Sequence, residues 1–259
     1  MRLARAPALE IRPTADRIRA GETAGGRLVG FEGVVEVALV RRERSPERDQ
    51  VVTCATATLR TGATRHYVLE VPPGLPPTAA GRRCAIEYEI TAKEALGDGR
   101  SATATVTLTA AGRTHLRSDA ALADRVLANA DARRFHLELA AADLQGGGRI
   151  SGRVHRHERW APGAPTVEVS LVEAWRAGVP SMSGIANWDS TVLWSARTTV
   201  DVDPDRTWMP FEFQIPPGLP PAVEGRAIAW RYELTARRSG LFTNIGGHAM
   251  LTPLLFEGG

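Results

Sequence analysis

Apolar and polar residues alternate along several short segments of this chain. The alternation has a period of two and occupies residues 67–71, 84–90 and 102–108. Such a period places apolar side chains on one face of a β-strand and polar side chains on the other. Residues 34–40 and 51–59 are rich in β-branched residues, which also favours strands. The pattern predicts an all-β chain of antiparallel sheets, each with one face in contact with water.

One stretch punctuated by proline occurs twice. Residues 71–77 read Val-Pro-Pro-Gly-Leu-Pro-Pro, and residues 215–221 read Ile-Pro-Pro-Gly-Leu-Pro-Pro, 144 positions later. The match extends over the windows 71–92 and 215–236, in which 13 of 22 positions are identical without a gap. Proline lacks an N–H and fixes φ, so each copy ends a strand and stiffens the connection that follows. We expect each copy to carry the chain from one sheet of a β-sandwich to the other.

The repeat divides the chain into two structural units. A length of 259 residues corresponds to about two domains. We assign residues 1–112 to an N-terminal β-sandwich, residues 113–134 to a linker and residues 135–259 to a C-terminal β-sandwich. Ser118 is a suitable N-cap, and residues 122–127 carry apolar side chains at i,i+4 spacing. This predicts one short helix in the linker, near the domain junction.

The second unit is longer than the first. Its Gly-Gly-Arg segment at 147–149 lies 122 positions after the one at 25–27, against 144 for the proline stretch, so about 22 extra residues separate these landmarks. All six tryptophans also lie in the second unit: Trp160, Trp175, Trp188, Trp194, Trp208 and Trp230. Trp230 follows the strand alternation and is expected in the core. We predict that Trp175, Trp188 and Trp194 belong to a long loop.

Charged residues gather in Arg41–Gln50, which we predict to be a loop. Tryptophan and arginine are enriched at protein-binding hot spots because they offer large or multiply hydrogen-bonding contact surfaces. The candidate partner-binding residues are therefore Trp175, Trp188 and Trp194, with Arg41 and Arg42. The alternative is that the tryptophans pack their own loop onto the sandwich.

Composition narrows the classes of function. The net charge is +3, and 32 basic residues face 29 acidic ones with no dense, uninterrupted basic cluster, so nucleic acid is not an expected partner. No run of about 18–20 apolar residues is present for a membrane span. The N-terminal residues lack the apolar segment of a secretory signal, which predicts a cytoplasmic protein. In the cytoplasm, we expect Cys54 and Cys84 to be reduced thiols rather than to form a disulfide.

Candidate chemistry is sparse, and we predict no catalytic site, metal or cofactor. Asp201, Asp203, Asp205 and Glu212 have the spacing of a calcium loop, but Arg206 stands where that loop needs glycine, so a solvated turn is expected. His155 and His157 share one face of a strand without a third ligand nearby in sequence. Nucleophile-elbow, phosphate-loop and His-Glu-x-x-His motifs are absent.

The repeated stretch resembles the arrestin-like proteins. The segment Phe-Glu-Phe-Gln-Ile-Pro-Pro at 211–217 is followed by Gly225 and by Tyr-Glu-Leu-Thr-Ala at 232–236. Residues 9–11 and 19–22 are similar to the opening strands of the same fold. This group includes arrestins, the arrestin-like subunit of retromer and bacterial sporulation-control proteins. The resemblance implies two Ig-like sandwiches in tandem, no enzyme activity, and work as an adaptor or scaffold.

We therefore expect a non-catalytic, cytoplasmic adaptor that binds protein partners and is compatible with forming a homo-oligomer. The partner surface is expected to involve the loop between Trp175 and Trp194 and the open edges of the sheets, where a partner can add a strand. An alternative from another class is a sandwich module that binds a small ligand or a carbohydrate, with tryptophans as stacking platforms. An enzyme is the least favoured class, because no pairing of a nucleophile with a base is visible.

Overall fold

The computed structural model describes residues 9–31, 33–61, 65–95, 99–109, 135–156, 166–177, 188–201, 203, 205–239 and 244–251. The chain folds as two compact units, Met1–Gly112 with Leu255–Gly259, and Arg113–Leu254. Every regular element in the described ranges is a strand, and the sheets are antiparallel apart from one short pairing. The all-β, antiparallel prediction is confirmed for these ranges. The helix predicted after Ser118 lies outside the described residues.

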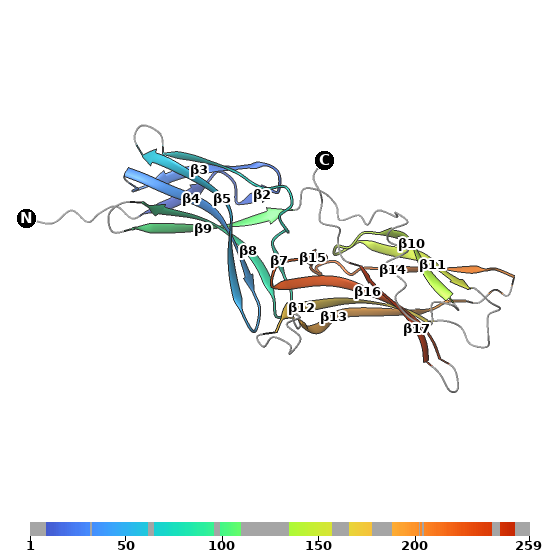
Figure 1. Ribbon diagram of the computed structural model, residues 1–259. Coiled ribbons are helices and arrows are strands. Elements are labelled where there is room, and N and C mark those ends of the chain that lie inside the picture. Colours follow the sequence, from blue (N-terminus) through green and yellow to red (C-terminus); the bar gives the residue numbers. More distant parts are fainter. Residues whose placement is uncertain are drawn as a thin grey trace, which may run out of the picture. The chain divides into compact units, whose positions relative to one another are not determined.

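The N-terminal unit contains two sheets (Figure 1). Its strands are β1 (Glu10–Pro13), β2 (Arg17–Arg19), β3 (Thr23–Val29), β4 (Gly33–Arg44), β5 (Asp49–Thr61), β6 (His66–Glu70), β7 (Ala79–Ala80), β8 (Ala85–Glu94) and β9 (Ser101–Thr109). One sheet has the order β1-β3-β6, and the other has the order β2-β9-β8-β4-β5 with β7 paired to β8. The β2–β9 pairing is parallel.

The C-terminal unit repeats this plan. Its strands are β10 (Phe135–Ala142), β11 (Arg149–Arg156), β12 (Thr166–Arg176), β13 (Trp188–Thr199), β14 (Trp208–Gln214), β15 (Val223–Glu224), β16 (Ile228–Ser239) and β17 (Asn244–Leu251). The order β10-β11-β14 matches β1-β3-β6, and β13-β12-β16-β17, with β15 on β16, matches β5-β4-β8-β9. Within the described ranges, the C-terminal unit has no counterpart of β2.

The proline stretches connect the two sheets of each unit. In the N-terminal unit the chain leaves β6 in one sheet and returns through β7 and β8 in the other, and β14, β15 and β16 do the same in the C-terminal unit. The predicted crossing is confirmed in both copies. The Tyr88 hydroxyl donates a hydrogen bond of 2.7 Å to the carbonyl oxygen of Pro76, which ties the N-terminal connection to the core.

The core of each unit takes side chains from both of its sheets, an arrangement consistent with a β-sandwich. In the N-terminal unit the largest buried side chains come from β3, β4, β6, β8 and β9: Leu28, Leu39, Tyr67, Leu69, Ile86, Tyr88, Ile90 and Leu108. In the C-terminal unit they include Leu144, Ile150, Trp230 and Tyr232. Most of these follow the alternation that the sequence displays, which is why the strands could be predicted.

Backbone pairing corrects the predicted alignment of the glycines. Gly26 lies opposite Tyr67 and Gly152 lies opposite Phe211. Tyr67 and Phe211 are 144 positions apart, whereas Gly26 and Gly152 are 126 apart, so the second unit holds 18 additional residues (144 − 126) rather than 22. Each glycine lies under an aromatic ring: a Cβ at Gly26 would meet the Tyr67 hydroxyl, and one at Gly152 would meet the Phe211 ring. The two Gly-Gly-Arg segments therefore do not occupy equivalent positions in the two units.

The predicted bounds of two loops are wrong. Arg41 to Arg44 belong to β4, and Asp49 begins β5, so only residues 45–48 connect these strands. Trp175 lies on β12, whereas Trp188 and Trp194 lie on β13. Both errors have the same cause: these strands continue past the point where alternation in the sequence ends, because pairing with a neighbouring strand stabilises them.

Candidate functional site

The strongest candidate surface in the described residues is a cluster of Trp188, Arg176 and Arg231, called the Trp188 cluster below. Trp188 begins β13 and lies directly opposite Arg176 of β12. The guanidinium carbon of Arg176 lies 5.7 Å from the centre of the Trp188 ring, and that of Arg231 on β16 lies 5.5 Å from it. Stacking of this kind orients the guanidinium groups, and that of the exposed Arg176 can still donate hydrogen bonds from its edge.

This cluster lies at the edge of its sheet, and an edge strand is called a border strand below. β13 pairs with β12 on one side and ends the strand order on the other. Trp188 is half-buried and Arg176 is exposed. Further along the same strand, Val192 is one of the few large apolar side chains left exposed in the described ranges. A partner strand added to β13 would therefore meet aromatic, apolar and cationic groups together.

The other predicted tryptophans take structural positions. Trp175 is buried on the core face of β12, so it offers no surface to a partner. Trp194 is half-buried and packs edge-on against Tyr232, with ring centres 6.5 Å apart. The structure therefore brings only Trp188 to the candidate surface. The segment 178–187 between β12 and β13 lies outside the described residues.

Arg41 and Arg42 lie on opposite faces of β4. Arg41 is buried in the core face and forms an ion pair of 2.9 Å with the fully buried Glu43. Arg42 is half-exposed and pairs with Glu89 at 3.0 Å. Arg41 is thus a core residue rather than a contact residue, and Arg42 is already engaged by a carboxylate. The sequence could not separate them, because both stand in one charged run.

The two units differ in charge at equivalent surface positions. In the N-terminal unit Arg44 pairs with Glu87 at 3.1 Å. Glu87 is equivalent to Arg231 in the 144-residue repeat, so an acidic residue of one copy is replaced by a basic one in the other. This reversal of charge between the two copies is visible in the aligned repeat and is a sequence signal for Arg231.

A second tryptophan–arginine cluster was missed in the sequence. Trp208 on β14 has the guanidinium carbon of Arg153 4.4 Å from its ring centre and that of Arg206 5.7 Å from it. It belongs to the smaller sheet of the unit. Guanidinium groups lie over both Trp188 and Trp208, whereas a sugar-stacking platform needs an open ring face. No observation here favours the carbohydrate-binding alternative.

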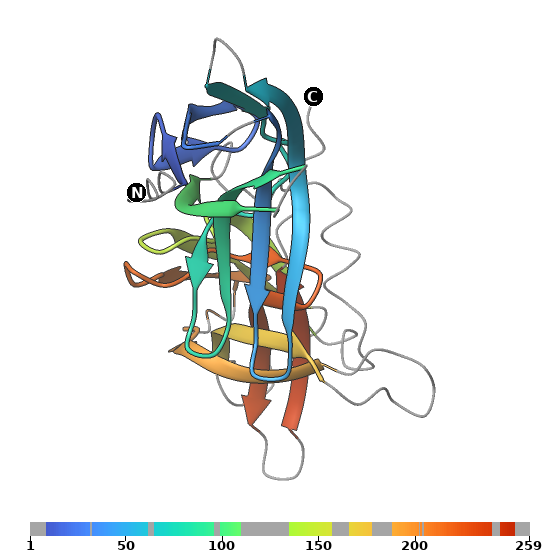
Figure 2. The same cartoon turned by 90° about the vertical axis from the view of Figure 1, so that its left-hand side faces the viewer.

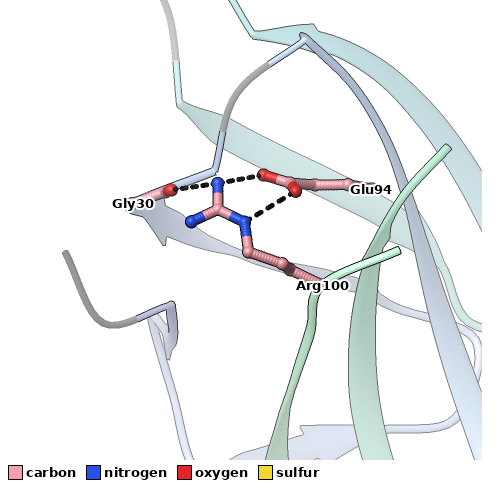
Figure 3. A network of polar contacts seen from close by, with 3 residues as sticks. All are labelled: Gly30, Glu94 and Arg100. Atoms are coloured by element: carbon pink, nitrogen blue, oxygen red, sulfur yellow. Dashed lines mark hydrogen bonds and ion pairs between the residues drawn. The ribbon is translucent and has the colours of Figure 1, made fainter. Parts of the chain in front are cut away.

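Another polar contact that the sequence did not reveal joins the turn after β3 to the β8–β9 hairpin (Figure 3). Arg100 donates two hydrogen bonds to Glu94, of 2.9 and 2.8 Å, and a longer one of 3.4 Å to the carbonyl oxygen of Gly30. The fork geometry matches a carboxylate in a bidentate pair. Glu94 is buried and already holds Arg100 in this pair, so we assign the contact to the stability of the fold.

Two of the residues considered as metal ligands, Asp203 and His155, contact other protein groups. Asp203 accepts hydrogen bonds from the Asp205 amide at 2.9 Å and pairs with Arg206 at 3.1 Å. His155 makes a 2.5 Å contact with Glu138 on the neighbouring strand. The described ranges contain no group of three or more His, Cys, Asp or Glu side chains arranged to hold a metal ion. His157 lies outside those ranges.

Comparison with protein-family models gives no match to this chain, and comparison with curated proteins gives none either. The resemblance to arrestin-like proteins therefore stays a prediction. In the part of the chain that the structure describes, no helix has the length and apolar character needed to cross a membrane.

Proposed function

We propose that this protein is a non-catalytic adaptor or scaffold of two tandem Ig-like sandwiches of the arrestin-like type, which binds protein partners in the cytoplasm. The observation that carries the proposal is the Trp188 cluster at the border strand β13. Tryptophan and arginine supply much of the binding energy at protein interfaces. A border strand supplies unpaired N–H and C=O groups that a partner strand can use.

The charge on this surface supports a partner with acidic groups. Arg176 and Arg231 stack on Trp188 from β12 and β16. A carboxylate near Trp188 would gain charge-assisted hydrogen bonds from the exposed Arg176 guanidinium, which stacking already orients, so less side-chain entropy is lost on binding.

Affinity capture from the native host tests this proposal. The wild type is compared with Trp188→Ala combined with Arg176→Glu, and with Trp208→Ala as a matched control on the other sheet. We expect a defined set of proteins that the wild type and the control retain. The affinity of a purified partner should fall about 30-fold in the Trp188 variant, as for loss of a hot spot.

Two results would count against the proposal. Capture of the same proteins by all three forms would remove the Trp188 cluster from the partner surface. Turnover of a small molecule that tracks the purified protein would contradict the non-catalytic role.

A further inference from the structure

β5 is a border strand that carries little protection against pairing with another strand. Among the described residues it pairs with β4 alone and stands last in the strand order. Figure 2 shows it beside β4. Between Asp49 and Arg60, residues 50–59 contain no charged side chain, and Val51 is 55% exposed. Natural sheets usually protect a border of this length with lysine, proline or inward-pointing charges.

A bulge in the middle of β5 decides which residues share a face. The β4–β5 register shifts between Leu39, which lies opposite Ala55, and Val40, which lies opposite Thr53, so Cys54 is the extra residue of the bulge. Exposed side chains consequently fall at 49, 51 and 53 before the bulge, and at 56, 58 and 60 after it. The exposed face changes from odd to even positions at the bulge.

This change permits one symmetric pairing of β5 with itself. A two-fold axis perpendicular to an antiparallel sheet keeps each residue on the same face in both copies, so opposed residues must share a face. Consider the register in which the numbers of two opposed residues add up to 109. The two-fold axis then passes through the bulge, and opposed residues share a face along the whole strand. Thr53 then lies opposite Thr56, and Val51 lies opposite Thr58.

The same register brings opposite charges together. Asp49 of one copy lies opposite Arg60 of the other, and the symmetry repeats this pair at the far end of the strand. Both side chains stand on the exposed face. We propose that this protein forms a symmetric dimer in which β5 pairs antiparallel with β5 of a second copy, with Asp49 opposite Arg60 at each end. This proposal does not depend on the adaptor function.

The equivalent border strand β13 does not allow such pairing of charges. Its charged residues are Asp189 and Arg197. Asp189 lies opposite Trp175 on the core face, whereas Arg197 lies opposite Glu168 on the other face. Because the two side chains point to different faces, no register of β13 with itself can place them opposite one another. Of these two equivalent border strands, β5 is therefore the one whose charges fit a second copy.

The pairing adds on the order of ten backbone hydrogen bonds, fewer near the two bulges. A strand-to-strand interface buries less surface than the roughly 1,200–2,000 Å² of a standard stable complex, so a concentration-dependent dimer is expected. Sedimentation equilibrium of the full chain, from about 1 to about 200 µM, should give a mass that rises from one copy toward two.

Charge swaps test the register. Asp49→Arg places two arginines opposite one another at each end, and Arg60→Asp does the same with two carboxylates, so each should weaken dimerisation tenfold or more. The double variant Asp49→Arg with Arg60→Asp restores complementary pairs and should return to the wild-type dissociation constant. Arg197→Asp on β13 should change nothing.

The proposal is overturned if the wild type stays monomeric throughout, if the single swaps dimerise as tightly as the wild type, or if the double swap remains as weak as the single ones. A folding defect in a variant is recognised by circular dichroism. Hydrogen exchange of the wild type gives an independent readout, since β5 amides should become protected as concentration rises. Equal exchange at low and high concentration would also overturn it.

Discussion

The N-terminal unit and the C-terminal unit bury a carboxylate at the same place in the same strand plan, and each stabilises it differently. Glu43 lies opposite Ile86, and Glu173 lies opposite Trp230, which is equivalent to Ile86 in the 144-residue repeat. Both glutamates are fully buried. Glu43 forms an ion pair with the buried Arg41, whereas Glu173 accepts a hydrogen bond of 3.3 Å from the Trp230 indole.

The position of Arg41 explains this difference. Arg41 lies opposite Tyr88, and its counterpart Leu171 lies opposite Tyr232. With leucine there, the C-terminal unit lacks the arginine that pairs with the carboxylate in the N-terminal unit, and the indole N–H of Trp230 donates a hydrogen bond to Glu173. Strand plan and burial are therefore the same in the two units, whereas a polar contact of the buried carboxylate differs: an arginine in one unit and an indole N–H in the other.

The largest effect is expected from breaking the buried pair. Glu43→Ala leaves the Arg41 guanidinium in the core without its carboxylate and should destabilise the N-terminal unit by about 3–5 kcal/mol. Replacing both residues, with Arg41→Met and Glu43→Leu, should recover most of this loss because the desolvation cost of both charges disappears. Urea unfolding followed by circular dichroism measures both variants. A double variant less stable than the single one would show that the pair contributes net stability.

In each unit, replacing the glycine that lies under an aromatic ring should lower the stability of the fold. A Cβ at Gly152 would approach the backbone oxygen of Glu138 as well as the Phe211 ring, so Gly152→Ala should cost about 3 kcal/mol. Gly26→Ala meets the Arg12 carbonyl oxygen and the Tyr67 hydroxyl and should cost a similar amount in its own unit.

Gly147 is the control for this prediction. It has φ of +83° and open space around its Cα, so Gly147→Ala should cost only about 1–2 kcal/mol of backbone strain. All tryptophans lie in the C-terminal unit, so fluorescence follows the unfolding of that unit for both variants. Equal losses for Gly147→Ala and Gly152→Ala would contradict the steric argument.

One tyrosine follows the proline connection in each unit. Removing its hydroxyl should lower the stability of the two units by unequal amounts. Tyr88→Phe leaves the Pro76 carbonyl oxygen without its donor and should cost about 1–2 kcal/mol. The Tyr232 hydroxyl is buried and has no hydrogen-bond partner among the described residues. Tyr232→Phe should therefore be near neutral. Chemical denaturation of both variants compares them, and a larger loss for Tyr232→Phe would refute the asymmetry.

Alkaline pH should destabilise the N-terminal unit more steeply. Burial raises the pKa of Tyr67 to about 12 and also raises the pKa of Tyr88 and Tyr232. Above the ordinary pKa near 10, an unfolded chain loses tyrosine protons that the folded chain keeps, so stability falls as pH rises. Each tyrosine contributes a slope of about 1.4 kcal/mol per pH unit in that window.

The N-terminal unit holds two of these tyrosines and the C-terminal unit holds one. Unfolding measured between about pH 9 and 11.5 should therefore show roughly twice the slope for the N-terminal unit. Tyr67→Phe should reduce that slope by the contribution of one tyrosine, about 1.4 kcal/mol per pH unit. A slope unchanged by this substitution would show that Tyr67 ionises as readily in the fold as in the unfolded chain.

The smallest effect is expected at the surface ion pairs that distinguish the two units. Arg44→Ala removes the exposed pair with Glu87 and should change stability by about 0.5 kcal/mol or less, and still less in high salt. Thermal unfolding at low and high ionic strength measures it. A loss above about 1 kcal/mol would mean that the Arg44 side chain packs against the sheet as well as pairing.

Much of the fold could be predicted because local physics and tertiary structure agree there. Alternation in residues 67–71 and 84–90 places the same side chains inward that the sheets bury. The repeated proline stretch predicted the crossing between sheets, since proline ends a strand wherever it stands. The candidate site was predicted only in part: Trp188 belongs to it, but Arg176 and Arg231 join it from other strands.

The sequence by itself determined the strand periodicity, the internal repeat and the places where the chain must turn, because these depend on neighbouring residues and on the geometry of glycine and proline. Only the tertiary structure decided that Arg41 is buried while Arg42 is at the surface, and that Gly26 corresponds to Gly152. Only pairing across strands revealed that the bulge at Cys54 brings Asp49 and Arg60 to one face. Such facts depend on register, which is set by contacts between residues far apart in the chain.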